Sequence, residues 1–144
     1  MATEATATLI DAMQFAIETG GGHCLVVDSE KEAFGGRNTG PRPIDLMAAS
    51  IAGCTAMDVI SILRKMQQQV TGLKVRVSSI DAEEHPKRLL ELQIRYTVTG
   101  VDIDPKKVAR AVELSETRYC PAMATINPDI CIDTGFEILE MGTD

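Results

Sequence analysis

The chain has 144 residues, a net charge of -7 and an aromatic content of only 3%, with no tryptophan. A chain of this length can bury its own core, and we expect residues 1–144 to form a single domain. The acidic charge would repel phosphate backbones and anionic lipid surfaces, so we expect neither nucleic acid nor membrane as a partner. The first residues lack a basic segment followed by an apolar one, which predicts a cytoplasmic protein without a secretion signal.

Alternating apolar and polar residues over 6–18 predict a half-buried strand. The three glycines at 20–22 suit a hairpin turn, and residues 23–28 are typical of the partner strand. Residues 29–43 form a polar segment interrupted by Gly and Pro, which predicts a loop. At about fifteen residues this loop is longer than most connections, so it is a candidate functional segment.

The most apolar stretch of the sequence follows this loop. Pro43 suits the first turn of a helix, where its missing N–H costs nothing, and the helix should run over 44–68. Its length would allow a membrane span, but Asp45 and Asp58 argue against one. A helix that is apolar nearly all round is more simply the buried central helix of a soluble fold or of a dimer.

The second half of the chain contains the clearest period of two, over 90–98, and a typical helix start at Asp104 and Pro105. The predicted elements are strands over 73–77 and 90–98, a helix from Pro105 to about Cys120, a short element after Pro121 and a last strand over 130–141. The order is strand, strand, helix, strand, strand, helix, strand. Without regular alternation of strand and helix, it predicts an α+β fold with mostly antiparallel sheet.

The four cysteines are the candidates for chemistry. Cys24, Cys54, Cys120 and Cys131 lie far apart, and in a reducing compartment free or transiently oxidised thiols are expected rather than structural bridges. Cys24 and Cys131 lie in strand patterns and are expected to be packing residues. The sequence has no C-x-x-C, and its two histidines have no ligand spacing, so no motif predicts a zinc site.

Cys54 lies among small and apolar residues of the predicted central helix, where a cysteine often acts only as a small hydrophobe. Asp58 follows four residues later and would disfavour a thiolate through like-charge repulsion. Cys120 precedes Pro121 and is expected at a helix N-cap, where backbone N–H groups, helped by Arg118, would stabilise a thiolate. Local sequence thus leaves a reactive and a packing role open for both cysteines.

Two segments carry a paired signal: GPRPIDLMAASIAGCTAMDVISILRK at 40–65 and YCPAMATI at 119–126. Together with the glycine-punctuated hairpin before them, they resemble the osmotically inducible protein C and organic hydroperoxide resistance (OsmC/Ohr) family over essentially the whole chain. The resemblance implies an OsmC-like α+β fold. In that fold antiparallel sheets surround two long central helices, one from each subunit of an intertwined homodimer.

The resemblance also implies an activity. In the peroxidase members the cysteine that matches Cys54 attacks an organic hydroperoxide and becomes a sulfenic acid, and the one that matches Cys120 condenses with it to a disulfide. A dithiol reductant then restores both thiols, with no metal or organic cofactor. An apolar pocket at the dimer interface would suit alkyl or lipid hydroperoxides better than hydrogen peroxide.

The sequence departs from the family pattern at the groups that activate the thiol. Members carry a Glu directly after the loop proline and an Arg in the N-terminal sheet, whereas here Ile44 follows Pro43 and the first 36 residues contain no Arg. Arg37, Arg42 and Asp45 are the candidates that could support the site instead. A non-catalytic or redox-sensing module that binds an apolar small molecule therefore stays open, as does a structural dimer without a ligand.

Overall fold

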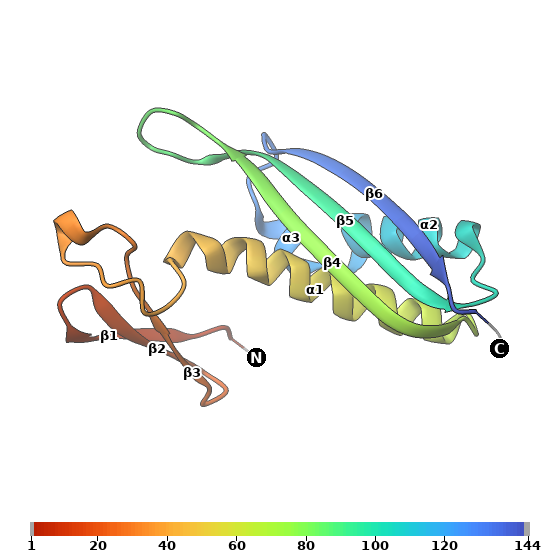
Figure 1. The fold of residues 1–144 in the computed structure, drawn as a ribbon, viewed down its shortest axis with the longest axis horizontal. Coiled ribbons are helices and arrows are strands. Elements are labelled where there is room, and N and C mark those ends of the chain that lie inside the picture. The colour runs from red at the N-terminus through yellow and green to blue at the C-terminus, as the bar shows by residue number, and fades with distance from the viewer. Residues whose placement is uncertain (1, 143–144) are drawn as a thin grey trace. The chain divides into compact units, whose positions relative to one another are not determined.

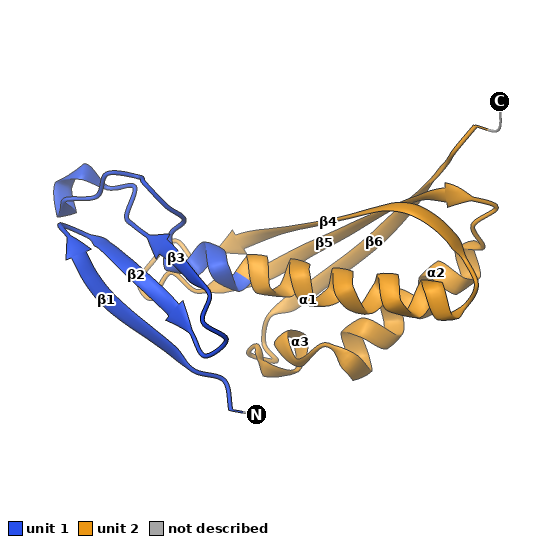
Figure 2. Cartoon of the chain, turned by 90° about the horizontal axis from the view of Figure 1, so that it is seen from below, with its two compact units in different colours: residues 1–47 blue, residues 48–144 orange. Residues whose placement is uncertain are grey.

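The computed structural model describes residues 2–142 and divides the chain into two compact units, 1–47 and 48–144 (Figure 2). Each unit contains a three-stranded sheet of its own. The long helix α1 (Pro43–Lys65) begins in the first unit and continues in the second. The expectation of a single domain over 1–144 stays a prediction.

The first unit is an antiparallel sheet in the order β1-β2-β3, with β1 at Ala5–Asp11, β2 at Gln14–Thr19 and β3 at Cys24–Val27. The prediction of one strand over 6–18 is wrong, because the chain reverses at residues 12–13. Ala12 adopts a positive φ of 49° there. This two-residue turn contains no Gly, Asn or Pro, and the alternation of apolar residues continues across it. The sequence therefore contains no signal that one strand ends and another begins there.

The predicted glycine hairpin is confirmed: β2 and β3 are joined through residues 20–23, and the backbone N–H of Thr19 donates to the carbonyl of His23 at 2.9 Å. The loop that follows contains a short 3₁₀ turn, η1 (Glu32–Phe34). The loop then returns so close to β3 that a Cβ added to Gly40 would collide with the carbonyl oxygen of Val26. Only glycine allows that approach.

Asp28 organises this loop from its buried position at the end of β3. Its carboxylate accepts hydrogen bonds from the backbone N–H groups of Ser29, Arg37 and Thr39, at 2.7, 3.3 and 3.1 Å. The hydroxyl of Thr39 donates to the same carboxylate at 2.6 Å. That hydroxyl and the three N–H groups hold the pKa of Asp28 below its ordinary value, although burial opposes them. The loop is therefore held by one ionised carboxylate.

The second unit is built on two long strands, β4 (Gln69–Asp81) and β5 (Leu89–Val101), which pair antiparallel. The alternation over 73–77 and 90–98 predicted both, and each extends further than the pattern. The third strand, β6 (Cys131–Glu140), pairs parallel with β5. The other three strand pairings within residues 2–142 are antiparallel, so the pairing is mostly antiparallel, as expected. The helical segment between β5 and β6 carries the chain back along the sheet, as a parallel pair requires (Figure 1).

That helical segment consists of α2 (Pro105–Leu114), a π-helical turn η2 (Ser115–Tyr119) and a short α3 (Pro121–Thr125). Its start is confirmed as predicted: the side chain of Asp104 accepts from the N–H of Lys106 at 2.9 Å, and Pro105 follows. The helices and α1 lie on one face of the β4-β5-β6 sheet (Figure 1).

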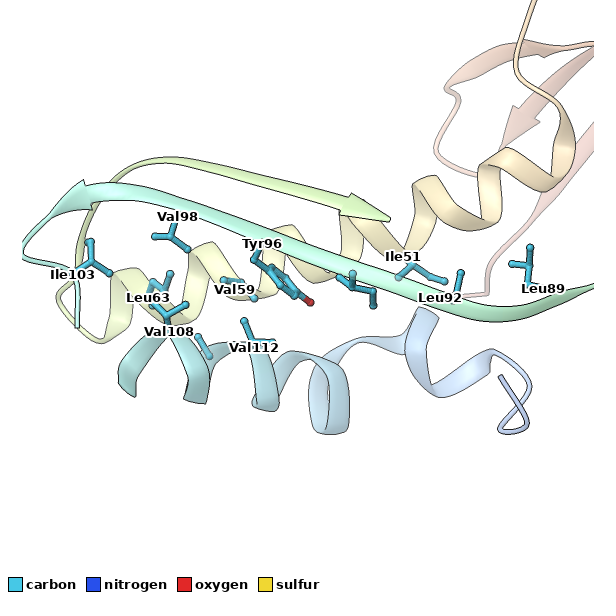
Figure 3. Close-up of a cluster of buried hydrophobic side chains, with 12 residues drawn as sticks. Ile51, Val59, Leu63, Leu89, Leu92, Tyr96, Val98, Ile103, Val108 and Val112 are labelled. Carbon is cyan, nitrogen blue, oxygen red and sulfur yellow. The ribbon is translucent and has the colours of Figure 1, made fainter. Parts of the chain in front are cut away.

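The core of the second unit lies between that face and the helices (Figure 3). Alternate residues of β5 enter it, namely Leu92, Ile94, Tyr96 and Val98. Helix α1 contributes one stripe at intervals of four residues, namely Ile51, Thr55, Val59 and Leu63. By length and composition alone α1 could cross a membrane, with a mean hydropathy of 1.8 over its most apolar part. Its buried stripe instead packs into this core, although the rest of the helix is less covered than predicted.

We expect Asp28→Asn to lower the free energy of unfolding at pH 7 and to have a smaller effect in acid. A carboxylate with a depressed folded pKa stabilises the fold fully above its ordinary pKa of 3.8, and that stabilisation is lost as the pH falls through the lower folded value. Urea unfolding of the variant and the natural chain at pH 7 and pH 3 measures the two differences. Glu84→Gln, in the exposed turn between β4 and β5, is the control. Equal differences at both pH values would contradict this account.

Candidate functional site

Two thiols and one carboxylate come together in the second unit. The sulfurs of Cys54 and Cys120 and a carboxylate oxygen of Asp58 all lie within 4.8 Å of one another. Cys120 is buried, while Cys54 and Asp58 are half-buried. All four cysteines of the chain are free thiols. The fold therefore brings close together the two cysteines that the family resemblance paired, although they are far apart in the sequence.

The positions of Cys54 and Asp58 on α1 relative to its buried residues determine which way their side chains face. Each lies one residue before a member of the buried stripe, Thr55 and Val59 respectively. Residues four apart lie on the same side of a helix, so the thiol and the carboxylate share one edge of the buried face. Thr55, which lies between them in sequence, is buried. Its hydroxyl donates to the carbonyl of Ile51 at 2.8 Å, so this buried polar group has a hydrogen-bond partner.

Cys120 is placed by the π-helical turn η2. Its backbone N–H donates to the carbonyl of Ser115 at 2.8 Å, which closes that turn. The hydroxyl of Ser115, which is fully buried, donates to Oδ2 of Asp58 at 3.1 Å. The segment that delivers Cys120 is thus tied directly to the carboxylate beside Cys54. Single π-helical turns of this kind occur frequently at functional sites.

The expected N-cap position of Cys120 is confirmed, but the expected stabilisation of its thiolate is wrong. The N–H of Met123 donates to the sulfur at 3.4 Å. Burial nevertheless raises the pKa of Cys120 to about 11, and the neighbouring Cys54 adds to the rise. The guanidinium of Arg118 lies over the ring of Tyr119 at 5.4 Å. At neutral pH Cys120 is therefore a protonated thiol.

A second buried contact fixes η2 from the side of the sheet. The hydroxyl of Tyr96, on β5, donates to Oε1 of Glu116 at 2.8 Å, and Thr134, on β6, donates to Oε2 at 2.8 Å. Burial of Tyr96, followed by the adjacent carboxylate, raises the pKa of its hydroxyl, so it stays a donor. Glu116 is the next residue after Ser115. The π-helical turn is therefore held both to the sheet and to α1.

The sequence did not identify these supporting residues. Tyr96 is one apolar position in a strand pattern, and Glu116 is one of many acidic residues, so neither carries a local signal. Asp58 did carry one, its spacing of four from Cys54, but a contact with Cys120 and Ser115 depends on the fold. Cys24 and Cys131 lie exposed, so the prediction that they are packing residues is wrong.

The supporting residues expected from the loop form ion pairs within the first unit. Arg37 lies 2.9 Å from the carboxylate of Asp11. Arg42 holds Asp45 with two side-chain contacts, Nη2 to Oδ1 at 2.6 Å and Nε to Oδ2 at 3.1 Å, and also contacts Glu30 at 3.4 Å. The hydrogen bonds from Arg42 lower the pKa of Asp45. The expected part of Arg37, Arg42 and Asp45 in the chemistry of Cys54 stays a prediction.

Taken chemically, two thiols this close can be joined by a disulfide after a small movement of the side chains. Cys54, the more accessible of the two, can meet a small molecule, while Cys120 is shielded. The fold thus places an accessible thiol beside a shielded one.

The comparison with known proteins agrees with this fold. The family model described as OsmC-like protein matches residues 36–135, and the chain belongs to that family. The curated relative Protein YhfA of Escherichia coli K12 is 29% identical over 130 residues, which cover 90% of this chain and 93% of YhfA.

Solved structures show the same fold. A hypothetical protein from Aquifex aeolicus VF5 has a TM-score of 0.86 at 25% identity, with 99% of each chain covered. An organic hydroperoxide resistance protein from Elizabethkingia anophelis has a TM-score of 0.73 at 15% identity, with 96% of this chain and 97% of that one covered. The expected OsmC-like α+β fold is therefore confirmed.

We expect Tyr96→Phe to lower the free energy of unfolding by about 1–3 kcal/mol, because it removes a buried donor from Glu116 and leaves an acceptor less satisfied. Chemical denaturation monitored by circular dichroism measures the change. Tyr119→Phe removes the same hydroxyl from an exposed ring and should change stability by less than about 0.5 kcal/mol. Equal effects of the two substitutions would mean that the contact with Glu116 stabilises nothing.

Proposed function

We propose that this protein is a thiol-dependent peroxidase that reduces organic hydroperoxides through Cys54 and Cys120. The observation that carries the proposal is the approach of these two sulfurs, together with Asp58, to within 4.8 Å in a member of the OsmC-like family. Structural neighbours that are themselves organic hydroperoxide resistance proteins, from Elizabethkingia anophelis and Bacillus subtilis, give it further support.

The reaction proceeds in three balanced steps. The sulfur of Cys54 attacks the hydroperoxide, the O–O bond breaks, an alcohol leaves and Cys54 becomes a sulfenic acid. The thiol of Cys120 then attacks that sulfur, an S–S bond forms and water leaves. A dithiol reductant finally supplies two electrons and two protons, which restore both thiols and leave the reductant as a disulfide. No metal or organic cofactor takes part.

The environments of the two cysteines support this division of roles. Cys54 is half-buried and can be reached from outside the core, whereas Cys120 is buried with its pKa raised to about 11. A shielded, protonated thiol is a poor first nucleophile. It can still act as the second, because the sulfenic acid forms beside it and the reaction is then intramolecular.

A homodimer would complete the site. Helix α1 buries one stripe in its own core, and Met57, one turn beyond Gly53, is 73% exposed. A second copy of the chain would cover this apolar side and build the pocket for an alkyl or lipid group beside Cys54. Such a protein would work in the cytoplasm, where dithiol reductants are present, in defence against oxidative stress.

The activation of Cys54 decides between this function and a second candidate. Ile44 stands where the peroxidases of the family carry their Glu, and Arg37 or Arg42, with Asp45, would have to supply the missing charge. Without it, the same fold would act as a redox-sensing or non-catalytic module that holds an apolar small molecule. The two functions differ in the rate at which Cys54 reacts.

We expect cumene hydroperoxide to oxidise the reduced protein much faster than it oxidises a free thiol, and to do so faster than hydrogen peroxide. Stopped-flow measurement followed by mass spectrometry should give a Cys54–Cys120 disulfide as the product. Cys54→Ser should abolish turnover, and Cys120→Ser should leave a Cys54 sulfenic acid that dimedone traps.

Cys131→Ser removes an exposed thiol outside the site and should react like the natural chain, which makes it the matched control. Oxidation no faster than that of a free thiol, or turnover that persists in Cys54→Ser, would overturn the peroxidase function. Slow oxidation with a bound apolar molecule would favour the second candidate.

We also expect the protein to run as a dimer in size-exclusion chromatography with light scattering, and Met57→Glu to weaken the dimer by placing a charge in its apolar interface. Met141→Glu makes the same exchange at an exposed residue after β6 and should leave the dimer intact. A natural chain that runs as a monomer would rule out the interface.

A further inference from the structure

We propose that the reduced site is also a binding site for a thiophilic divalent cation, of which Zn²⁺ is the best match. The ligands are the sulfurs of Cys54 and Cys120 and a carboxylate oxygen of Asp58, with water in the fourth position. The sequence predicted no metal site because it has no C-x-x-C. A C-x-x-C motif places two sulfurs close together within one short segment. Here the fold brings two sulfurs together although they lie 66 positions apart in the sequence.

The spacing of the three ligand atoms suits a tetrahedral ion. With Zn–S bonds of about 2.3 Å and a Zn–O bond of about 2.1 Å, tetrahedral angles place the ligand atoms about 3.5–3.8 Å apart. The three atoms here lie within 4.8 Å of one another, so at most about 1 Å of closure is needed. Rotation of the half-buried side chains of Cys54 and Asp58, which lie one turn apart on α1, brings these two ligands toward the buried sulfur of Cys120.

The carboxylate is already held in position as a metal ligand would be. Ser115 is fully buried, and its hydroxyl donates to Oδ2 of Asp58 at 3.1 Å. That contact fixes the carboxylate and leaves Oδ1 outside this bond. Metal-bound carboxylates are usually oriented by a second group in this manner.

Of the three proposed ligands, Asp58 borders a pocket. This pocket of about 460 Å³ is lined by Asp58 together with residues of α1 and the helical segment, among them Lys65, Leu114 and Tyr119. It gives room for a water ligand on the side of the carboxylate. A three-ligand site with one open position is the arrangement seen in accessible rather than purely structural zinc centres.

The donor atoms also decide which cation binds. Two soft sulfurs favour Zn²⁺, and its softer analogue Cd²⁺, over Mg²⁺ and Ca²⁺, which take oxygen ligands. Because the sulfurs that bind the ion are those that form the disulfide, bound metal and disulfide exclude each other. Binding of the ion releases the two thiol protons to water. A two-electron oxidant such as diamide then takes two electrons from the two thiolates, one S–S bond forms and Asp58 remains as the single protein ligand, so the ion leaves.

The test uses the full chain with Cys24→Ser and Cys131→Ser, which removes both exposed thiols outside the cluster. Zn²⁺ is titrated into the reduced protein without oxygen, against a chromophoric chelator, and Co²⁺ serves as a spectroscopic probe. We expect one Zn²⁺ for each chain and a sulfur-to-cobalt charge-transfer band. Diamide, which takes up two electrons and two protons as the disulfide forms, should release the ion.

Four variants distinguish the ligand residues and their support from a neighbouring residue that binds no metal. Asp58→Asn and Cys120→Ser should each weaken Zn²⁺ binding at least as much as Ser115→Ala, for which we expect about 10–100-fold. Ser61→Ala, a neighbour of Asp58 in the pocket, should leave the affinity unchanged. Circular dichroism of each variant shows whether it is folded, and the charge-transfer band of Co²⁺ reports the sulfur ligands directly.

Absence of binding by the reduced, folded protein would overturn the site, as would equal affinity in Asp58→Asn or in the diamide-treated protein. None of these measurements uses a hydroperoxide, and the site does not depend on the peroxidase function. A protein that binds Zn²⁺ but reacts slowly with cumene hydroperoxide would refute only the peroxidase, and the reverse result would refute only the metal site.

Discussion

The phenol of Tyr96 is the constraint on which the rest of the site depends. A hydroxyl on a fully buried ring must find a partner, and it finds Glu116 on the π-helical turn after α2. Once Glu116 is fixed at the sheet, its neighbour Ser115 faces α1 and bonds to Asp58. The turn then closes on the N–H of Cys120 and sets that thiol beside Cys54. This buried hydrogen bond thus helps to hold the turn that carries Cys120 beside Cys54.

Two opposing effects act on Cys120, and their balance explains its character. Its N-cap position offers an N–H group to the sulfur, which favours the thiolate, while burial disfavours charge. Burial prevails, because α3 spans only Pro121–Thr125 and offers few N–H groups. The two cysteines of the site therefore differ in accessibility, and the proposed division of roles between them rests on this difference.

The sequence predicted those elements whose signals are local. Alternation over 90–98 predicted β5, and Pro43 and the Asp104–Pro105 pair marked two helix starts. The reversal at residues 12–13 was missed because no turn residue marks it, and the parallel pairing of β6 depends on a connection that no period encodes. At the site, Cys54 and Cys120 were found through family resemblance. Asp58, Ser115 and Tyr96 needed the fold, because their partners lie far away in the chain.

The buried residues of α1 and the residues of the candidate site follow the same helical spacing, and this restricts which changes in the helix the protein can tolerate. Cys54 and Asp58 precede Thr55 and Val59 by one residue each, so the reactive edge and the buried stripe turn together. One residue inserted into this helix would rotate everything beyond it by about 100°, and it would remove the carboxylate from the thiols as it removed Val59 from the core. Evolution can therefore alter this helix by substitution but not by changes in length. A change in chain length is tolerated more readily in a surface loop, such as the one around Asp28, than within this helix.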